Sequence, residues 1–226
     1  MVMLSTLSQK NFTLFSMSKI RNIIFDLSEV LLTGIKDTGV ALAEKHKIDD
    51  AFFHPVPWSR FKTPLLVPLV EEFFHGNVSE DEYIRAVLKE YPQVGTQEWL
   101  KEHIRENFKE VEGTREIILE LQKSRYKLAL LSVHSREWID YCEKKFKFHD
   151  LFYVISYSFD EKVSKPDPVS FKNILKKLNA QPEECLFIDD SEKNIVVAET
   201  LGIKSILFTN AENLRKDLRK ILKENF

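Results

Sequence analysis

Short, largely apolar runs are spread along the chain, and apolar and polar residues do not alternate within them. Runs of this kind are typical of strands that are buried on both faces. The candidate strands are Ile20 to Phe25, Lys127 to Leu131, Leu151 to Ile155, Cys185 to Ile188 and Ser205 to Phe208.

Between these runs, apolar residues return at spacings of three and four, which places them on one face of an α-helix. A strand followed by a helix, repeated along the chain, is the order of a parallel sheet with helices on both faces. The sequence therefore predicts an α/β fold with a doubly wound, Rossmann-like parallel sheet. The helical stretches are Glu116 to Leu121, Trp138 to Cys142, Phe171 to Leu178 and Ile195 to Leu201.

Residues 33–110 interrupt this alternation after the first strand. Helical spacing is present at Val78 to Glu90 and at Glu98 to Phe108, and no stretch has a convincing strand pattern. Four of the eight prolines fall within the fourteen residues 55–68, where we expect helices to stop. The expected division of the chain is an N-terminal extension at 1–18, a core formed by 19–32 and 111–226, and a helical insert at 33–110.

Composition and charge narrow the functional classes. The 226 residues include 33 basic and 35 acidic side chains, so the formal net charge is −2, and no global positive field exists to hold nucleic acid or an anionic membrane. No run of eighteen apolar residues occurs that could cross a membrane. Two cysteines are too few for a disulfide framework, which favours a reducing compartment, and we expect the cytoplasm.

Polar side chains follow the predicted strands at the edge where an open parallel sheet binds its ligands. They are Asp26, Ser132, Lys165 in a later loop, and the pair Asp189 and Asp190. Taken singly, each of them has an ordinary explanation as the cap of a turn or a helix. Together, the three acids suit a hard cation, while the lysine, the hydroxyl and nearby backbone amides suit a phosphoryl group.

The segments around these residues resemble the four motifs of the haloacid dehalogenase superfamily, in the same order and with matching spacing. They are Phe25 to Leu31 for motif I, Leu130 to Ser132 for motif II, Ser164 to Pro166 for motif III, and Phe187 to Asn194 for motif IV. The resemblance covers roughly 20–208, and the helical insert resembles the cap that this superfamily inserts after motif I. Motif I, in which Phe-Asp-Leu precedes a small residue, resembles a capped phosphatase branch.

The resemblance implies a nucleophile and a metal site. Asp26 would attack phosphorus and form an aspartyl-phosphate, which is a known role of carboxylates. Asp26, Asp190 and the backbone carbonyl of Ser28 would hold Mg²⁺, with Asp189 as a further or alternative ligand. Asn194 would orient this metal shell from outside.

The resemblance also implies a phosphate site. Ser132, the backbone amide of Val133 and Lys165 would hold the transferring oxygens, and Lys165 would also offset the repulsion among the acids. Val133 stands where the family often has Asn, so one side-chain hydrogen bond is absent while the amide is retained.

A second departure concerns the general acid. Hydrolases of this family usually carry another Asp two residues after the nucleophile, and here that position is Ser28. Loss of a general acid or base typically removes about 10² to 10⁴ in rate, so substrates with good leaving groups, such as sugar 1-phosphates, should suffer least. Glu29 and His134 are the candidates for a replacement acid, although a His at the position of His134 more often helps to start the next helix.

These features predict a Mg²⁺-dependent phosphatase acting on a small phosphorylated metabolite, such as a sugar phosphate, through an aspartyl-phosphate. The main alternative is a non-catalytic or weakly active relative that binds a ligand or a protein, with Ser28 as its mark. A carbon–halogen dehalogenase needs no metal and is disfavoured by Asp189 and Asp190, and a phosphomutase would need the missing Asp.

Overall fold

The structure is a computed structural model that describes residues 20–47 and 67–222. The predicted N-terminal extension at 1–18 and most of the proline-rich stretch lie outside these residues. Among the described residues, no helix has both the length and the apolar character needed to cross a membrane.

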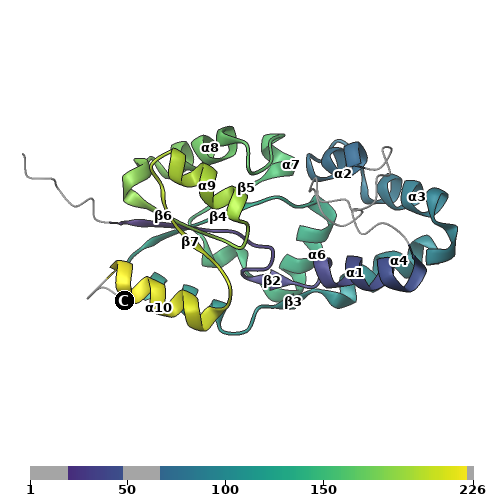
Figure 1. Cartoon of the computed structure of the whole chain (residues 1–226), viewed down its shortest axis with the longest axis horizontal. Helices are drawn as coiled ribbons and strands as arrows, with labels where there is room; N and C mark the ends of the chain where they lie inside the picture. The colour runs from purple at the N-terminus through teal and green to yellow at the C-terminus, as the bar shows by residue number, and fades with distance from the viewer. Residues whose placement is uncertain (1–19, 48–66, 223–226) are drawn as a thin grey trace, which may run out of the picture.

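A parallel sheet in the order β5-β4-β1-β6-β7 forms the centre of the described chain (Figure 1). Helices cover both of its faces, so the predicted α/β, doubly wound fold is confirmed. The strands are β1 (Asn22–Phe25), β4 (Lys127–Ser132), β5 (Val154–Tyr157), β6 (Cys185–Asp189) and β7 (Lys204–Leu207).

One predicted strand begins later than expected. Leu151 belongs to a short 3-10 turn at His149–Leu151, and β5 starts at Val154, which pairs with Ala129 of β4. Leu151 and Phe152 are buried although they precede the strand. An apolar turn that packs on the core has the same composition as a buried strand, so the pattern alone does not separate them.

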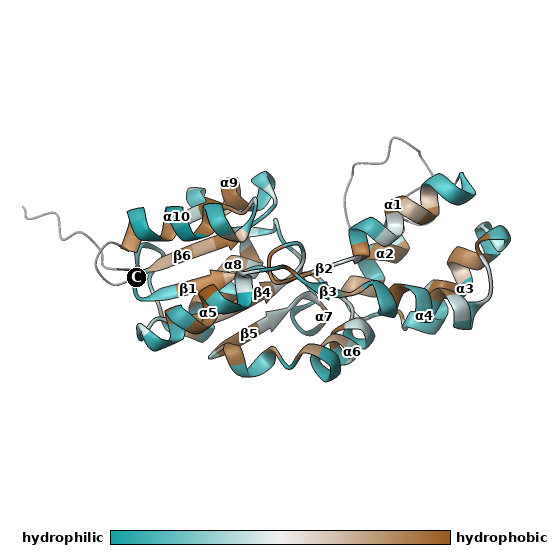
Figure 2. Cartoon of the chain, turned by 90° about the horizontal axis from the view of Figure 1, so that it is seen from below, coloured by the Kyte–Doolittle hydropathy of each residue, from teal (hydrophilic) through white to brown (hydrophobic). Residues whose placement is uncertain are grey.

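The two faces of the sheet bury different sets of side chains. Ile24 and Phe187 point to the face covered by α8 and α9, whereas Phe25 and Leu130 point to the face covered by α5, α6 and α10. In Figure 2 the strands are largely apolar and hydrophilic residues line the outer surfaces of the covering helices. The helices of this part are α5 (Thr114–Lys123), α6 (Arg136–Phe146), α7 (Ser158–Glu161), α8 (Pro168–Leu178), α9 (Glu192–Thr200) and α10 (Ala211–Leu222), with a further 3-10 turn at Pro182–Glu184.

The helices of residues 33–110 stand beyond the carboxyl ends of the strands (Figure 1). Before and after them, the chain pairs as a short antiparallel ribbon, in which Thr33 lies opposite Lys109. This ribbon, β2 (Leu32–Thr33) with β3 (Lys109–Glu110), was not expected from the pattern because each strand has only two residues. We call residues 33–110 the helical insert. Its helices are α1 (Ile35–His46), α2 (Val67–Phe74), α3 (Glu80–Glu90) and α4 (Gln97–Asn107), with a 3-10 turn at Pro92–Val94.

Local signals fix where two of these helices begin. Ser79 caps α3, because its hydroxyl accepts a hydrogen bond from the Glu82 amide while the Glu82 carboxylate accepts one from the Ser79 amide. Pro68 lies in the first turn of α2, where the missing N–H has no helical partner. The last of the clustered prolines therefore starts a helix instead of ending one.

The insert shares its apolar core with α6. The indole of Trp138 has no exposed surface and lies edge-on to the rings of Phe73 and Phe74, at centroid distances of 5.0 and 5.9 Å. Its Nε1 donates to Oε1 of Glu80 on α3 at 2.9 Å, and Arg105 of α4 donates to the other carboxylate oxygen at 2.5 Å. The contact is therefore both apolar and hydrogen-bonded, and it holds the insert beside the carboxyl ends of the strands.

Candidate active site

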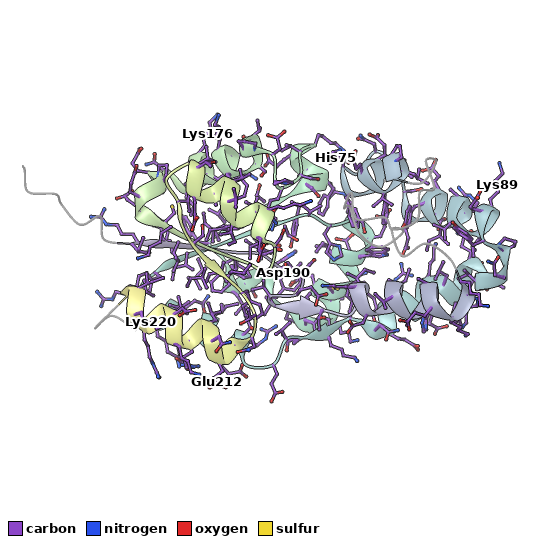
Figure 3. The ribbon with its side chains drawn as sticks, viewed as in Figure 1. His75, Lys89, Lys176, Asp190, Glu212 and Lys220 are labelled. Atoms are coloured by element: carbon purple, nitrogen blue, oxygen red, sulfur yellow. The ribbon has the colours of Figure 1, made fainter. Side chains whose placement is uncertain are left out.

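The strand register brings the predicted site residues to one edge of the sheet. Phe25 of β1 lies opposite Leu130 of β4 and Ile188 of β6. Asp26 and Asp189 therefore follow directly at the ends of neighbouring strands, and Asp26 donates its backbone N–H to the Ile188 carbonyl at 2.9 Å. In Figure 3, Asp190 lies between the end of the sheet and the helical insert.

Lys165 joins the two strand ends. Its Nζ lies 2.8 Å from Oδ1 of Asp26 and 2.7 Å from Oδ2 of Asp189, and the residue is 9% exposed. Burial alone would lower the pKa of Lys165, but the attraction of Asp189 and Asp26 outweighs it and raises the pKa above its usual value. The ammonium group is therefore charged at neutral pH and fixed in place.

Asp189 is fully buried, and both of its oxygens are already engaged. Besides Lys165, it accepts hydrogen bonds from the Ser191 amide at 2.8 Å and from Nδ2 of Asn194 at 2.9 and 3.0 Å. Asn194 thus contacts Asp189 directly. Asp190 is only partly buried.

The carboxylates form a group that suits a cation. Asp26, Asp189 and Asp190 each offer one oxygen, and these oxygens lie within 4.8 Å of one another. Burial raises the pKa of Asp26 well above its usual value, as does repulsion by the other two acids, while Lys165 opposes this rise. Burial and Asp189 likewise raise the pKa of Asp190. Three acids beside a single lysine leave excess negative charge, and the all-oxygen donor set fits a hard divalent cation such as Mg²⁺.

Ser132 supplies an unsatisfied polar atom at the same edge. The residue is 1% exposed, and its Oγ has no hydrogen-bond partner among the residues that the structure describes. A buried polar group without a partner costs about 1 to 3 kcal/mol. The neighbouring Val133 is partly exposed. An oxygen of a ligand held by Lys165 and these groups would satisfy the hydroxyl.

Comparison with known proteins identifies the family. The sequence model described as haloacid dehalogenase-like hydrolase matches residues 23–208. The chain belongs to this family. Its motif resemblances and its fold therefore agree with its membership of the haloacid dehalogenase-like hydrolases.

The individual proteins that this chain resembles differ from it at most of their aligned residues. Flavin mononucleotide hydrolase 1 of Arabidopsis thaliana is 28% identical over 150 residues, which are 65% of this chain and 59% of that protein. Pyrophosphatase PpaX of Bacillus thuringiensis is 24% identical over 192 residues, 83% of this chain and 82% of that protein. A haloacid dehalogenase family enzyme from Bacteroides thetaiotaomicron has the same fold, with a TM-score of 0.72, 22% identity, and coverage of 89% of this chain and 99% of that one.

Ser28 occupies the position where hydrolases of this family usually carry a second Asp, and the structure shows its surroundings. Ser28 is partly buried and forms an isolated bridge with Leu32. Its neighbour Glu29 has φ 59° and accepts a hydrogen bond from Thr33 Oγ1 at 2.8 Å on one oxygen, while the other oxygen has no partner in the described part of the chain. Burial raises the pKa of Glu29, and Asp190 raises it further. Glu29 is thus near the acids, yet one of its oxygens is tied to the start of the insert.

His134 is buried in an aromatic cluster and is not placed as a proton donor. Its ring packs against Phe74, Phe108 and Trp138, and burial lowers its pKa to about 4. Nδ1 accepts a hydrogen bond from the Ser135 amide at 3.1 Å, which leaves the ring proton on Nε2. The residue is a neutral part of the aromatic packing between α6 and the insert.

Sequence reasoning missed two residues that contact the loops of the site. Ser158 accepts a hydrogen bond from the His134 amide, and His75 shares one with the hydroxyl of Ser164, next to Lys165. His75 and Ser164 are 89 positions apart. No local pattern pairs residues so distant, and only the position of Ser164 within a motif hinted at a contact there.

Proposed function

We propose that this protein is a Mg²⁺-dependent phosphatase that hydrolyses a small phosphorylated metabolite through an aspartyl-phosphate on Asp26. The observation that carries the proposal is the placement of Lys165, whose ammonium bridges Asp26 and Asp189. Ser132, at the end of the neighbouring strand β4, has a buried hydroxyl without a partner among the described residues. In this proposal, the nucleophile, the cation and the hydroxyl donor act on one phosphoryl group.

The metal would be held mainly by Asp26, Asp190 and the carbonyl of Ser28. Asp189 would add an oxygen only by exchanging one of its bonds to Lys165, Ser191 or Asn194, so we assign it chiefly to positioning Lys165. Mg²⁺ bound by these groups would supply positive charge to the transferring oxygens. The Bacteroides enzyme of the same fold has been solved with magnesium and inorganic phosphate, which supports this assignment.

The reaction follows from these positions. An oxygen of Asp26 attacks phosphorus in line with the leaving oxygen, so the new bond to Asp26 forms as the bond to the leaving oxygen breaks with its electron pair. Lys165, Ser132 and the amide of Val133 stabilise the negative charge on the remaining oxygens. Water then attacks phosphorus as the bond between phosphorus and the Asp26 oxygen breaks with its electron pair. The water gives up a proton to solvent, so phosphate is released and the carboxylate of Asp26 is restored.

Substrate choice is limited by the missing proton donor at Ser28. Without a general acid there, the departing oxygen must carry its own negative charge or receive a proton from solvent, which favours good leaving groups. Two similar proteins are named flavin mononucleotide hydrolase and pyrophosphatase. These names support a small phosphorylated substrate. The helical insert, docked over the strand ends, would act as a cap that excludes water and selects the rest of the substrate.

A second candidate function is favoured by Ser28 itself. A member without its proton donor could bind a phosphorylated ligand at Lys165 and Ser132 and release it unchanged. Such a protein would retain Mg²⁺-dependent binding of inorganic phosphate and would lack turnover.

Hydrolysis of p-nitrophenyl phosphate tests the proposal, because this leaving group needs little protonation. We expect turnover that requires Mg²⁺, stops on chelation and is abolished in Asp26→Asn. Asp140→Asn, an exposed carboxylate on α6, is the matched control and should retain activity. Absence of turnover in the unmodified protein, together with phosphate binding by calorimetry, would establish the binding function instead.

A further inference from the structure

One turn of the helical insert lies against both loops that would hold the phosphoryl group. This turn, Phe74 to Gly76, begins at the last residue of α2, the helix that packs on α7. Figure 3 shows His75 on the side of the insert that borders α7. The turn belongs to the insert, whereas the loops belong to the α/β core, so any bond between them couples the two parts of the molecule.

The first link leads to the loop of Ser132 and Val133. The hydroxyl of Ser158, which is 2% exposed, donates to the Phe74 carbonyl at 2.6 Å. The same oxygen accepts a hydrogen bond from the backbone N–H of His134 at 3.1 Å. Because a hydroxyl has one proton and two lone pairs, Ser158 satisfies both backbone groups at once. His134 directly follows Val133, so this link fixes the far end of the phosphate-holding loop.

The second link leads to Lys165. Nε2 of His75 and Oγ of Ser164 share a hydrogen bond at 2.9 Å. Ser164 is the residue before Lys165, whose ammonium lies between Asp26 and Asp189. The bond therefore ties the turn to the backbone that carries the central cation of the site.

The turn is built to lie this close to α7. Gly76 has φ +66°, and a Cβ on it would meet the Phe159 Cβ at 3.0 Å and the Phe159 carbonyl oxygen at 3.2 Å. Only glycine allows both this backbone conformation and this approach without displacement.

We infer that the turn is a positioning element for catalysis. His75 holds the loop of Lys165, and the Phe74 carbonyl, through the hydroxyl of Ser158, holds the loop of Ser132 and Val133. This inference rests on the proposed phosphatase function for its kinetic consequence. Both links start from one turn, so a shift of α2 would displace both loops together. The placement of the insert thus sets the geometry in which a phosphoryl group is held.

Variants of His75 test the inference, because the residue is only partly buried and its loss should not prevent folding. In His75→Ala, we expect kcat for p-nitrophenyl phosphate to fall about 10- to 100-fold, since small misplacement of catalytic groups has costs of that size, with KM changing less. In His75→Gln, whose amide can still bond Ser164, kcat should recover most of this loss. Lys162→Met is the control. It removes the exposed hydrogen bond from Lys162 to the His75 carbonyl without touching either loop, and it should retain kcat.

A double-mutant cycle isolates the contact. If His75 acts through Ser164, the variant His75→Ala with Ser164→Ala should be no slower than the slower single variant, because both remove one interaction. Melting temperatures are measured for every variant. Unchanged kcat in His75→Ala, an equal loss in Lys162→Met, additive losses in the cycle, or no recovery in a folded His75→Gln would each overturn the inference.

The binding of inorganic phosphate with Mg²⁺ separates this inference from the proposed function. If the unmodified protein binds phosphate but shows no turnover, the phosphatase proposal fails. The positioning inference then stands if His75→Ala weakens phosphate binding about tenfold or more while Lys162→Met does not. If the unmodified protein shows no turnover, equal phosphate binding by all three proteins would overturn the positioning inference.

Discussion

The ammonium of Lys165 lies 2.7 Å from Oδ2 of Asp189, a carboxylate without exposed surface. Asp189 holds that lysine while its own oxygens are held by the Ser191 amide and by Asn194. Asp190, the next residue, is only partly buried. Two adjacent acids therefore have different environments, and we expect different roles for them.

Substitution of Asp190 should act on the metal requirement. Asp190→Asn removes one negative ligand, so we expect the Mg²⁺ concentration at half-maximal activity to rise about 10- to 100-fold, with much of the rate restored at saturating Mg²⁺. Activity is measured against Mg²⁺ concentration, with Asp140→Asn as the control for an exposed acid. A variant with an unchanged Mg²⁺ curve would place the metal elsewhere.

Substitution of Asp189 should act on the rate at every Mg²⁺ concentration. In Asp189→Asn, Lys165 loses the partner that contributes most to its raised pKa and part of its anchoring. We expect kcat to fall about 100-fold or more, as for loss of a group that stabilises transition-state charge. Full recovery of the rate at high Mg²⁺ would instead show that Asp189 serves mainly as a ligand.

Much of this arrangement was predictable from sequence because it depends on strand ends. The apolar runs before Asp26, Ser132 and Asp189 identify buried parallel strands, and parallel strands bring the residues that follow them to one edge. Lys165 follows no strand directly, and the sequence located it only in a later loop, without its contacts to Asp26 and Asp189. The division of roles between Asp189 and Asp190 depends on individual hydrogen bonds, which the pattern of residue types does not specify.

The remaining features depend on contacts between distant residues. The pattern marked Trp138 as a core residue of a helix, but its bond to Glu80 of the insert spans 58 positions. The link from His75 to Ser164 spans 89. Such pairs follow from how the insert packs on the core, which sequence spacing within a helix or strand does not describe.

The missing proton donor can be restored to test its effect. If the site lacks only a general acid, Ser28→Asp should raise the rate on alkyl phosphates severalfold or more and change the rate on p-nitrophenyl phosphate little. A full gain of about 10² to 10⁴ is the upper bound, because a new carboxylate beside Asp26 and Asp190 adds repulsion. Rates on both substrates are compared in the two proteins.

The opposite result of that comparison is also informative. A lower rate on both substrates would mean that Ser28 makes a necessary contact of its own, or that another group such as Glu29 already supplies the proton. Glu29→Gln then distinguishes these cases, because loss of a working proton donor would slow alkyl phosphates more than p-nitrophenyl phosphate.

Acid should destabilise the folded protein through His134. Burial among Phe74, Phe108 and Trp138 lowers its pKa to about 4, whereas an unfolded chain has a histidine pKa near 6.5. Between these values the unfolded state binds more protons, so the free energy of unfolding falls as pH falls from about 6.5 towards 4 and is unaffected by this residue above 6.5. The shift corresponds to about 3 kcal/mol.

In His134→Asn, an amide oxygen can still accept from the Ser135 amide, but no proton is taken up. In urea unfolding at several pH values, the free energies of unfolding of the unmodified protein and of this variant should therefore converge as pH falls. The comparison variant is His103→Asn, at a partly buried position on α4. A difference between the two proteins that is the same at pH 7.5 and pH 4.5 would show that His134 is not the neutral, buried histidine that its packing indicates.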